Sequence, residues 1–265
     1  MRDTTACPRC HAPRHASARF CPRCGESLPK ASARGSDPAT GELGLHEDLL
    51  LLAIDDESGR VTRGCASTCS LAIAGGVLAE LMLAKGFSVD EGKKRLVDVT
   101  DPRPPGDPLL DEVLERMHTS SRRRRLQSWV TMVARTKNLR DRIATGLCRR
   151  GILEAVEHNT RILFFNIHRK TYPTRDPLPE YATVARLREA IYSDAPKCDE
   201  RTAILLSLAS AAGLLSIRFP KKDLKARKQH IKTLAEGEAV GKAVRDVIAA
   251  MQAAYIAATT AAMAG

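Results

Sequence analysis

The sequence predicts a mainly α-helical protein with one β-hairpin, preceded by a small zinc-ribbon head. Three observations indicate this fold class: apolar residues recur at helical spacing through most of the chain, one stretch has the strand and turn pattern of a hairpin, and two CxxC motifs lie near the N-terminus. The chain has 265 residues, of which 43% are hydrophobic and 28% are charged. These values are typical of a globular protein with a sizeable core. We expect a zinc ribbon over 1–28, a flexible linker over 29–42 and a helical domain over 43–265.

The N-terminal head carries two thiolate pairs with the spacing CxxC–x10–CxxC. Four thiolates on two tight turns can surround one tetrahedral Zn²⁺, and a site with four protein ligands has no open position, which predicts a structural metal. So short a segment cannot bury a core, so the metal would supply its folding free energy. His11 and His15 are competing ligands, and a redox CxxC would need a βαβ context that the sequence lacks. The predicted zinc ligands are Cys7, Cys10, Cys21 and Cys24.

The linker and the first two helices are marked by changes in composition. Residues 29–42 are small, polar and rich in Pro and Gly, which is typical of a flexible linker. A short, strongly apolar helix is predicted over 45–54, and the polar residues 55–59 end it. A second helix over 69–85 is apolar on nearly all sides, which predicts burial. Its Gly75–Gly76 pair predicts close packing of a neighbouring backbone.

The middle of the helical domain is expected to run from a loop through helices to the hairpin. The loop over 97–108 contains four prolines, and Asp107 or Asp111 can cap the helix after it. Further helices are predicted from Leu109 to Met117, over 126–134 and over 138–150. The predicted hairpin has strands over 152–156 and 162–167 and a turn at 158–160. The C-terminal half is predicted to hold helices over 180–192, 201–212, 221–234 and 238–262.

The positive charge is concentrated in one segment. The whole chain has a net charge of +11, while residues 116–175 hold fifteen Lys and Arg against three acids, a net charge of +12. A basic belt in an otherwise balanced chain indicates a polyanionic partner, either nucleic acid or an anionic membrane surface. A solvated face that binds nothing in particular is the alternative interpretation.

Several classes of protein are disfavoured. The N-terminus lacks the pattern of a secretory signal, and the uncharged residues 247–265 are too weakly apolar for a membrane span. Aromatic residues make up only 4%, which argues against a binder of single strands through stacking. No GxSxG, P-loop, GxGxxG or HExxH motif occurs, so we expect no enzymatic activity. We expect His46-Glu47 and Asp55-Asp56-Glu57 to begin and end one helix.

Five blocks in sequence order carry a family resemblance. They are LHEDLLLLAIDDESGRV (45–61), AGGVLAELMLAKG (74–86), PPGDPLLDEVLERM (104–117), LRDRIATGLCRRGIL (139–153) and ILFFNIHRKTYPTRDP (162–177). Together they resemble the Golgi phosphoprotein 3 family, in its bacterial branch, over about residues 45–250. The resemblance implies a helical domain that sits peripherally at the cytoplasmic face of a membrane. It also implies binding to phosphatidylinositol 4-phosphate or another anionic phospholipid, and an adaptor role for client membrane enzymes.

The same resemblance implies a set of site residues. The family's head-group pocket uses a Trp, an Arg on the early buried helix and a basic pair three residues apart. The basic pair falls on Lys137 and Arg140, which we expect to share one helical face. The Arg position falls on Ala74 and the Trp position falls near Cys65, so two elements are missing. Arg63 is a candidate substitute.

The predicted hairpin admits two interpretations. In the family, the hairpin supports membrane contact or self-association, and it corresponds to residues 155–168 here. A helix that ends at Arg149-Arg150-Gly151, followed by a basic hairpin, also resembles a winged helix-turn-helix element. With the zinc ribbon and the run Arg122–Arg125, this pattern makes DNA binding the alternative function.

Overall fold

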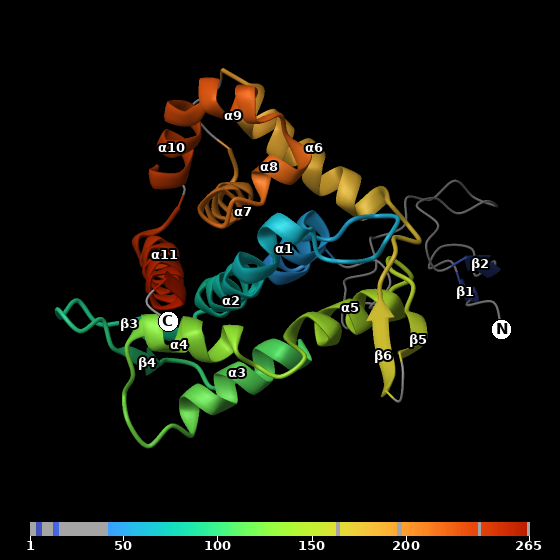
Figure 1. The fold of residues 1–265 in the computed structure, drawn as a ribbon. Helices are drawn as coiled ribbons and strands as arrows, with labels where there is room; N and C mark the ends of the chain where they lie inside the picture. Colours follow the sequence, from blue (N-terminus) through green and yellow to red (C-terminus); the bar gives the residue numbers. More distant parts are fainter. Residues whose placement is uncertain are drawn as a thin grey trace. The chain divides into compact units, whose positions relative to one another are not determined.

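The computed structural model describes residues 4–6, 13–15, 42–162, 165–194, 198–237 and 240–263. The chain divides into two units, Met1–Gly41 and Glu42–Gly265. In the first unit, β1 (Thr4–Ala6) pairs antiparallel with β2 (Pro13–His15). The predicted zinc ligands and nearly all of the predicted linker lie outside the described residues. The second unit is mainly helical, which confirms the predicted fold class for this part (Figure 1).

The second unit consists of helices and two antiparallel hairpins. The hairpins are β3 (Phe87–Val89) with β4 (Val97–Val99), and β5 (Val156–Ile162) with β6 (Phe165–Thr171). The helices are α1 (Leu45–Ala53), η1 (Arg63–Cys65), α2 (Ala66–Leu83), α3 (Pro108–His118), α4 (Leu126–Ala134), α5 (Leu139–Arg149), α6 (Leu178–Tyr192), α7 (Glu200–Ala211), α8 (Leu215–Arg218), α9 (Lys221–Ala226), α10 (Lys228–Glu236) and α11 (Lys242–Met263).

The expectation of a single hairpin in the helical domain is wrong. The hairpin of β3 and β4 was not predicted, and β4 begins where the sequence predicts a loop. Strands of three residues are too short to show an alternating pattern. The second hairpin is confirmed, but the predicted turn at 158–160 lies inside β5. Ile152 and Leu153, expected in its first strand, are core residues that precede it.

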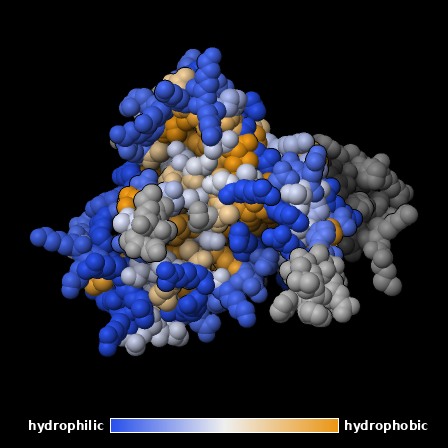
Figure 2. Space-filling view, viewed as in Figure 1, coloured by the Kyte–Doolittle hydropathy of each residue, from blue (hydrophilic) through white to orange (hydrophobic). Residues whose placement is uncertain are grey.

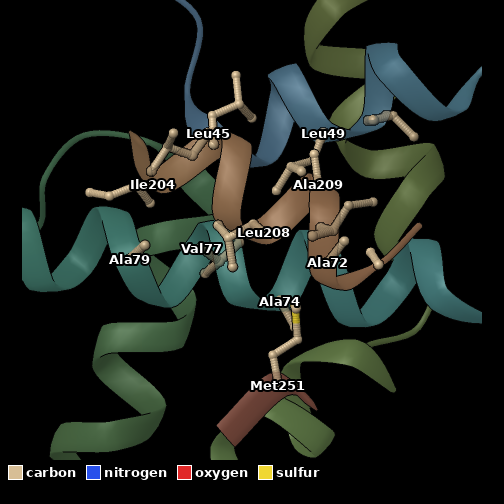
Figure 3. Packing of buried hydrophobic residues seen from close by; sticks show 14 of the residues in the cluster. Leu45, Leu49, Ala72, Ala74, Val77, Ala79, Ile204, Leu208, Ala209 and Met251 are labelled. Carbon is tan, nitrogen blue, oxygen red and sulfur yellow. The ribbon is translucent and has the colours of Figure 1, made fainter. Parts of the chain in front are cut away.

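The core is built around α1 and α2, which lie at the centre of the helical unit (Figure 1). All nine residues of α1 are buried. A Cβ placed on Gly76 would lie 2.9 Å from the backbone nitrogen of His46, and one on Gly75 would lie 2.8 Å from Cδ2 of Leu208. Figure 3 shows Met251 of α11 reaching α2 from the side opposite to α1. The Gly75–Gly76 pair therefore sits at close helix contacts, which confirms the prediction.

The charged residues of α1 are buried and paired. The carboxylate of Glu47 accepts a hydrogen bond from the backbone N–H of Gly44 at 2.9 Å and lies 2.7 Å from Nη1 of Arg150, on α5's C-terminal side. Asp48 lies 3.3 Å from Nη2 of Arg186 on α6, and burial raises the pKa of its carboxyl group. Because an unpaired buried charge is costly, these contacts hold α5 and α6 in place against α1. Through its hydrogen bond with Gly44, Glu47 caps the start of the helix, as the sequence predicts.

Gly76→Ala should destabilise the protein, because its methyl group would meet the backbone of α1. We expect a loss of about 1–3 kcal/mol in the free energy of unfolding, measured by urea denaturation. Gly146→Ala, within α5, is the matched control. Its Cβ would have no atom within 4 Å, so this change should stabilise by about 0.5–1 kcal/mol. Wild-type stability of Gly76→Ala would contradict the close crossing.

Candidate functional site

A groove with a volume of about 690 Å³ lies on the helical unit. The end of α1, the loop after it, the start of α2, the junction of α4 and α5, and the end of β6 line it. Asp141 is the one carboxylate among its lining residues. Its cationic lining residues come from four separate segments: Arg60, Arg63, Arg135, Arg140, Arg169 and Lys170. The cationic groove is therefore assembled by folding and not by one run of sequence.

The loop after α1 is fixed where it meets the end of β6. Asp55 accepts a hydrogen bond from the backbone of residue 58, which closes the turn that ends α1. Gly59 has φ +61°, and a Cβ there would lie 2.3 Å from the backbone nitrogen of Pro173, so only glycine fits. Its carbonyl accepts a hydrogen bond from the N–H of Tyr172 at 2.9 Å. These contacts place Arg60 beside β6.

Asp56 connects the same loop to α6 and α8. Its carboxylate lies 3.2 Å from Nη2 of Arg218 and accepts a hydrogen bond from the hydroxyl of Thr174 at 3.3 Å. Arg218 also pairs with the buried Glu180 and donates to the carbonyl of Ile54 at 2.8 Å. The pKa of Glu180 is raised to about 7, chiefly by burial and also by the neighbouring Asp56, while the charge of Arg218 lowers it. The loop after α1 is thus tied to α6 and α8 by one arginine, which pairs with the buried Glu180 and the partly exposed Asp56.

The N-terminus of α5 opens onto the groove. Asn138, the N-cap residue, adopts a left-handed conformation with φ 54°, and its side chain makes no capping hydrogen bond to the first turn. A helix N-terminus carries partial positive charge and unpaired N–H groups, which favour an anion. Asp141 in this turn is engaged by the hydroxyl of Tyr172. Burial, together with the charge of Asp141, raises the pKa of Tyr172 to about 12.

Most of the cations of the groove are not neutralised by acids. Lys170 pairs with Glu157 at 3.0 Å. Among the residues that the structure describes, none of the five arginines of the groove forms an ion pair. Some other arginines of the basic belt are paired: Arg123 with Asp90 and Asp98, and Arg142 with Glu112. The groove thus gathers five arginines whose charge no acid among the described residues offsets.

The predicted basic pair is divided by the fold. Arg140 lines the groove, whereas Lys137 is exposed and lies outside its lining. The expectation that both lie on one helical face is wrong, because α5 begins at Leu139 and the left-handed Asn138 separates the two residues. Lys137 therefore flanks the groove, while Arg140 belongs to it.

The other positions implied by the resemblance also have defined places. Ala74 and Cys65 are buried and do not line the groove. Arg63 lines it, as expected of a substitute for the missing residues. Sequence reasoning missed Arg60, Arg135, Arg169 and Lys170 as members of one site. The available signal was that Arg60 and Arg63 directly follow the polar turn that ends the first helix.

The buried carboxyl of Glu180 predicts a pH-dependent stability. Because the folded chain holds this proton more tightly than the unfolded chain does, stability should fall as pH rises from the ordinary glutamate range to about 7. Glu180→Gln should flatten this part of the profile in urea denaturation at several pH values. Glu189→Gln, which changes an exposed residue of α6, should keep the wild-type slope. An unchanged slope in Glu180→Gln would contradict this assignment.

Comparison with protein families identifies the helical unit. No helix in the described ranges combines the length and the apolar character that a bilayer span requires. The family model of Golgi phosphoprotein 3 (GPP34) matches residues 45–251. This match includes every lining residue of the cationic groove and covers well over half of the chain. The chain therefore belongs to the Golgi phosphoprotein 3 family.

Proposed function

We propose that this protein is a non-enzymatic, peripheral membrane protein that binds a phosphoinositide, or another anionic lipid head group, in the cationic groove. The observation that carries the proposal is the gathering of six cationic side chains from distant segments, five of them without an ion pair among the described residues. Membership of the Golgi phosphoprotein 3 family supports it. An adaptor role for client membrane enzymes, at the cytoplasmic face of a membrane, completes the proposal.

The chemistry of the groove suits a phosphorylated head group. An arginine can bind two phosphate oxygens through its planar guanidinium group, and a lysine adds a point charge. The groove's volume of about 690 Å³ lies in the range of small-molecule sites. We assign the head-group phosphate to Arg63 and Arg140, next to the uncapped first turn of α5.

Lys137 and the hairpin extend this contact to the membrane surface. An exposed cation near an anionic leaflet contributes roughly 1 kcal/mol, which is the role we assign to Lys137. The hairpin of β5 and β6 supplies Arg169 and Lys170 to the groove. Membrane contact or self-association through residues 155–168 is therefore coupled to head-group binding in this proposal. Binding should weaken as salt screens the charges.

Charge reversal in the groove tests the proposal. Arg63→Glu and Arg140→Glu should each weaken binding to vesicles containing phosphatidylinositol 4-phosphate by about 10- to 30-fold in sedimentation assays, because each removes an attraction of roughly 1 kcal/mol and adds a similar repulsion. Arg122→Glu is the matched control. It changes the same charge on the exposed loop between α3 and α4, at the opposite end of the unit from β6 (Figure 1).

Three results would overturn the lipid assignment. The first is wild-type vesicle binding by Arg140→Glu, and the second is an equal loss of vesicle binding in Arg122→Glu. The third concerns the alternative function, DNA binding through the basic hairpin. If the protein retards duplex DNA at a given salt concentration and ignores anionic vesicles at the same salt, the groove serves nucleic acid.

For the N-terminal head, we propose a structural Zn²⁺ held by the four cysteines of the two CxxC motifs. The spacing of the thiols supports this. The antiparallel strands β1 and β2 support it too, because residues 7–12, which contain the first motif, connect them. Two thiols three positions apart in the sequence can converge on one metal.

Metal analysis of the full chain tests the zinc proposal. We expect one zinc per chain, and its loss in Cys7→Ser with Cys10→Ser. Cys148→Ser with Cys198→Ser is the control pair, since both residues lie in the helical unit, and it should retain the metal. Vesicle binding should persist in the first variant, because the groove is built without the head. Zinc retained after loss of Cys7 and Cys10 would contradict the assigned ligands.

A further inference from the structure

A second groove, with a volume of about 520 Å³, lies between α7, α10 and α11. It shares no lining residue with the cationic groove. Figure 2 shows apolar surface, in orange, beside the blue side chains of α9 and α10 on this face of the molecule. We call this second feature the helical pocket.

The walls of the helical pocket are stripes of three helices. Each helix contributes residues three, four or seven positions apart, which share one helical face. Ile231 on α10 and Ile248 on α11 are buried and form part of its apolar surface. Leu215 of α8 and Leu224 of α9 close one side. The space is thus an open pocket lined by several helices and not a gap at one helix end.

The rim of the helical pocket is positively charged. Lys228 is exposed, and no described acid pairs with it, while Lys232 lies 3.9 Å from Glu236. Arg245 donates from Nη1 to the carbonyl oxygens of residues 237 and 240, at 3.1 and 2.5 Å, which holds its guanidinium group at the rim. The segment 221–232 around this rim carries six Lys and Arg against one acid. The electrostatic complement of this rim is an anion.

An apolar interior beneath a cationic rim matches a ligand with two parts. The interior gives no charged partner for a purely ionic ligand, and it favours removal of an alkyl chain from water. The rim favours a negative group that stays partly hydrated. A cavity of about 520 Å³ lies in the range of small-molecule sites.

We propose that the helical pocket binds a single-chain fatty acid, with the alkyl chain against Ile231 and Ile248 and the carboxylate beside Lys228. This site is independent of the cationic groove and of the function proposed for that groove. Occupation would add an acyl-chain ligand to a protein whose other site faces lipid head groups.

Calorimetric titration of the full chain with decanoate, below its micellar concentration, tests the site. We expect binding by the wild type and a loss of at least 10-fold in Ala249→Trp, which places an indole in the pocket from an exposed position. Lys228→Glu should weaken decanoate binding about 10-fold and leave decanol binding within 2-fold. Lys222→Glu, on α9 and outside the lining, is the matched control and should bind decanoate as the wild type does.

These measurements test the helical pocket separately from the cationic groove, because the two sites share no lining residue. Ala249→Trp and Lys228→Glu should keep wild-type thermal unfolding, which shows that the fold is intact. Absence of decanoate binding by the wild type overturns the proposal, and so does undiminished binding by both variants. An equal loss of decanoate and decanol binding in Lys228→Glu would overturn the assigned role of the lysine.

Discussion

The close crossing of α1 and α2 is the constraint on which the rest of the helical unit depends. Gly76 has no side chain, so the backbone of α1 can approach α2 near His46. Together with the packing of α5, α6, α7 and α8, this contact buries all nine residues of α1, including its carboxylates. A buried carboxylate needs a cationic or hydrogen-bonding partner. Arg150, just after α5, and Arg186, in the middle of α6, meet that need, so the buried carboxylates of α1 help to hold α5 and α6 in place.

The cationic groove follows from the same core. The end of α1 and the start of α2 are two of its walls, and the loop between them carries Arg60 and Arg63. Like charges in one groove repel, so the arrangement needs a rigid frame. Gly59, held against the backbone of residues 172 and 173, and Asp56, held by Arg218, supply that frame. Local electrostatic repulsion offset by surrounding packing is a common property of binding sites.

The basic residues of the chain have three different roles in the fold. Some arginines, such as Arg123 and Arg142, meet acids from other elements and stabilise the unit. The arginines of the groove meet other cations, and they keep their charge directed at solvent. A third group, on α9 and α10, surrounds an apolar cavity instead of a polar one. Equal formal charges therefore serve structure, anion binding and the rim of an apolar pocket, according to their neighbours.

The sequence by itself determined the helical class, most of the helices and the close contact at Gly75–Gly76, and it singled out Arg140, which lines the groove. Apolar periodicity, glycine and family motifs are local signals. Tertiary structure alone decided the rest. It broke the predicted helix over 221–234 at Arg227, added β3 and β4, and removed Lys137 from the lining of the groove. It also brought Arg60 and Arg169 into one groove. The direction of a side chain depends on contacts between residues that are far apart in the chain, and no periodicity along the sequence records such contacts.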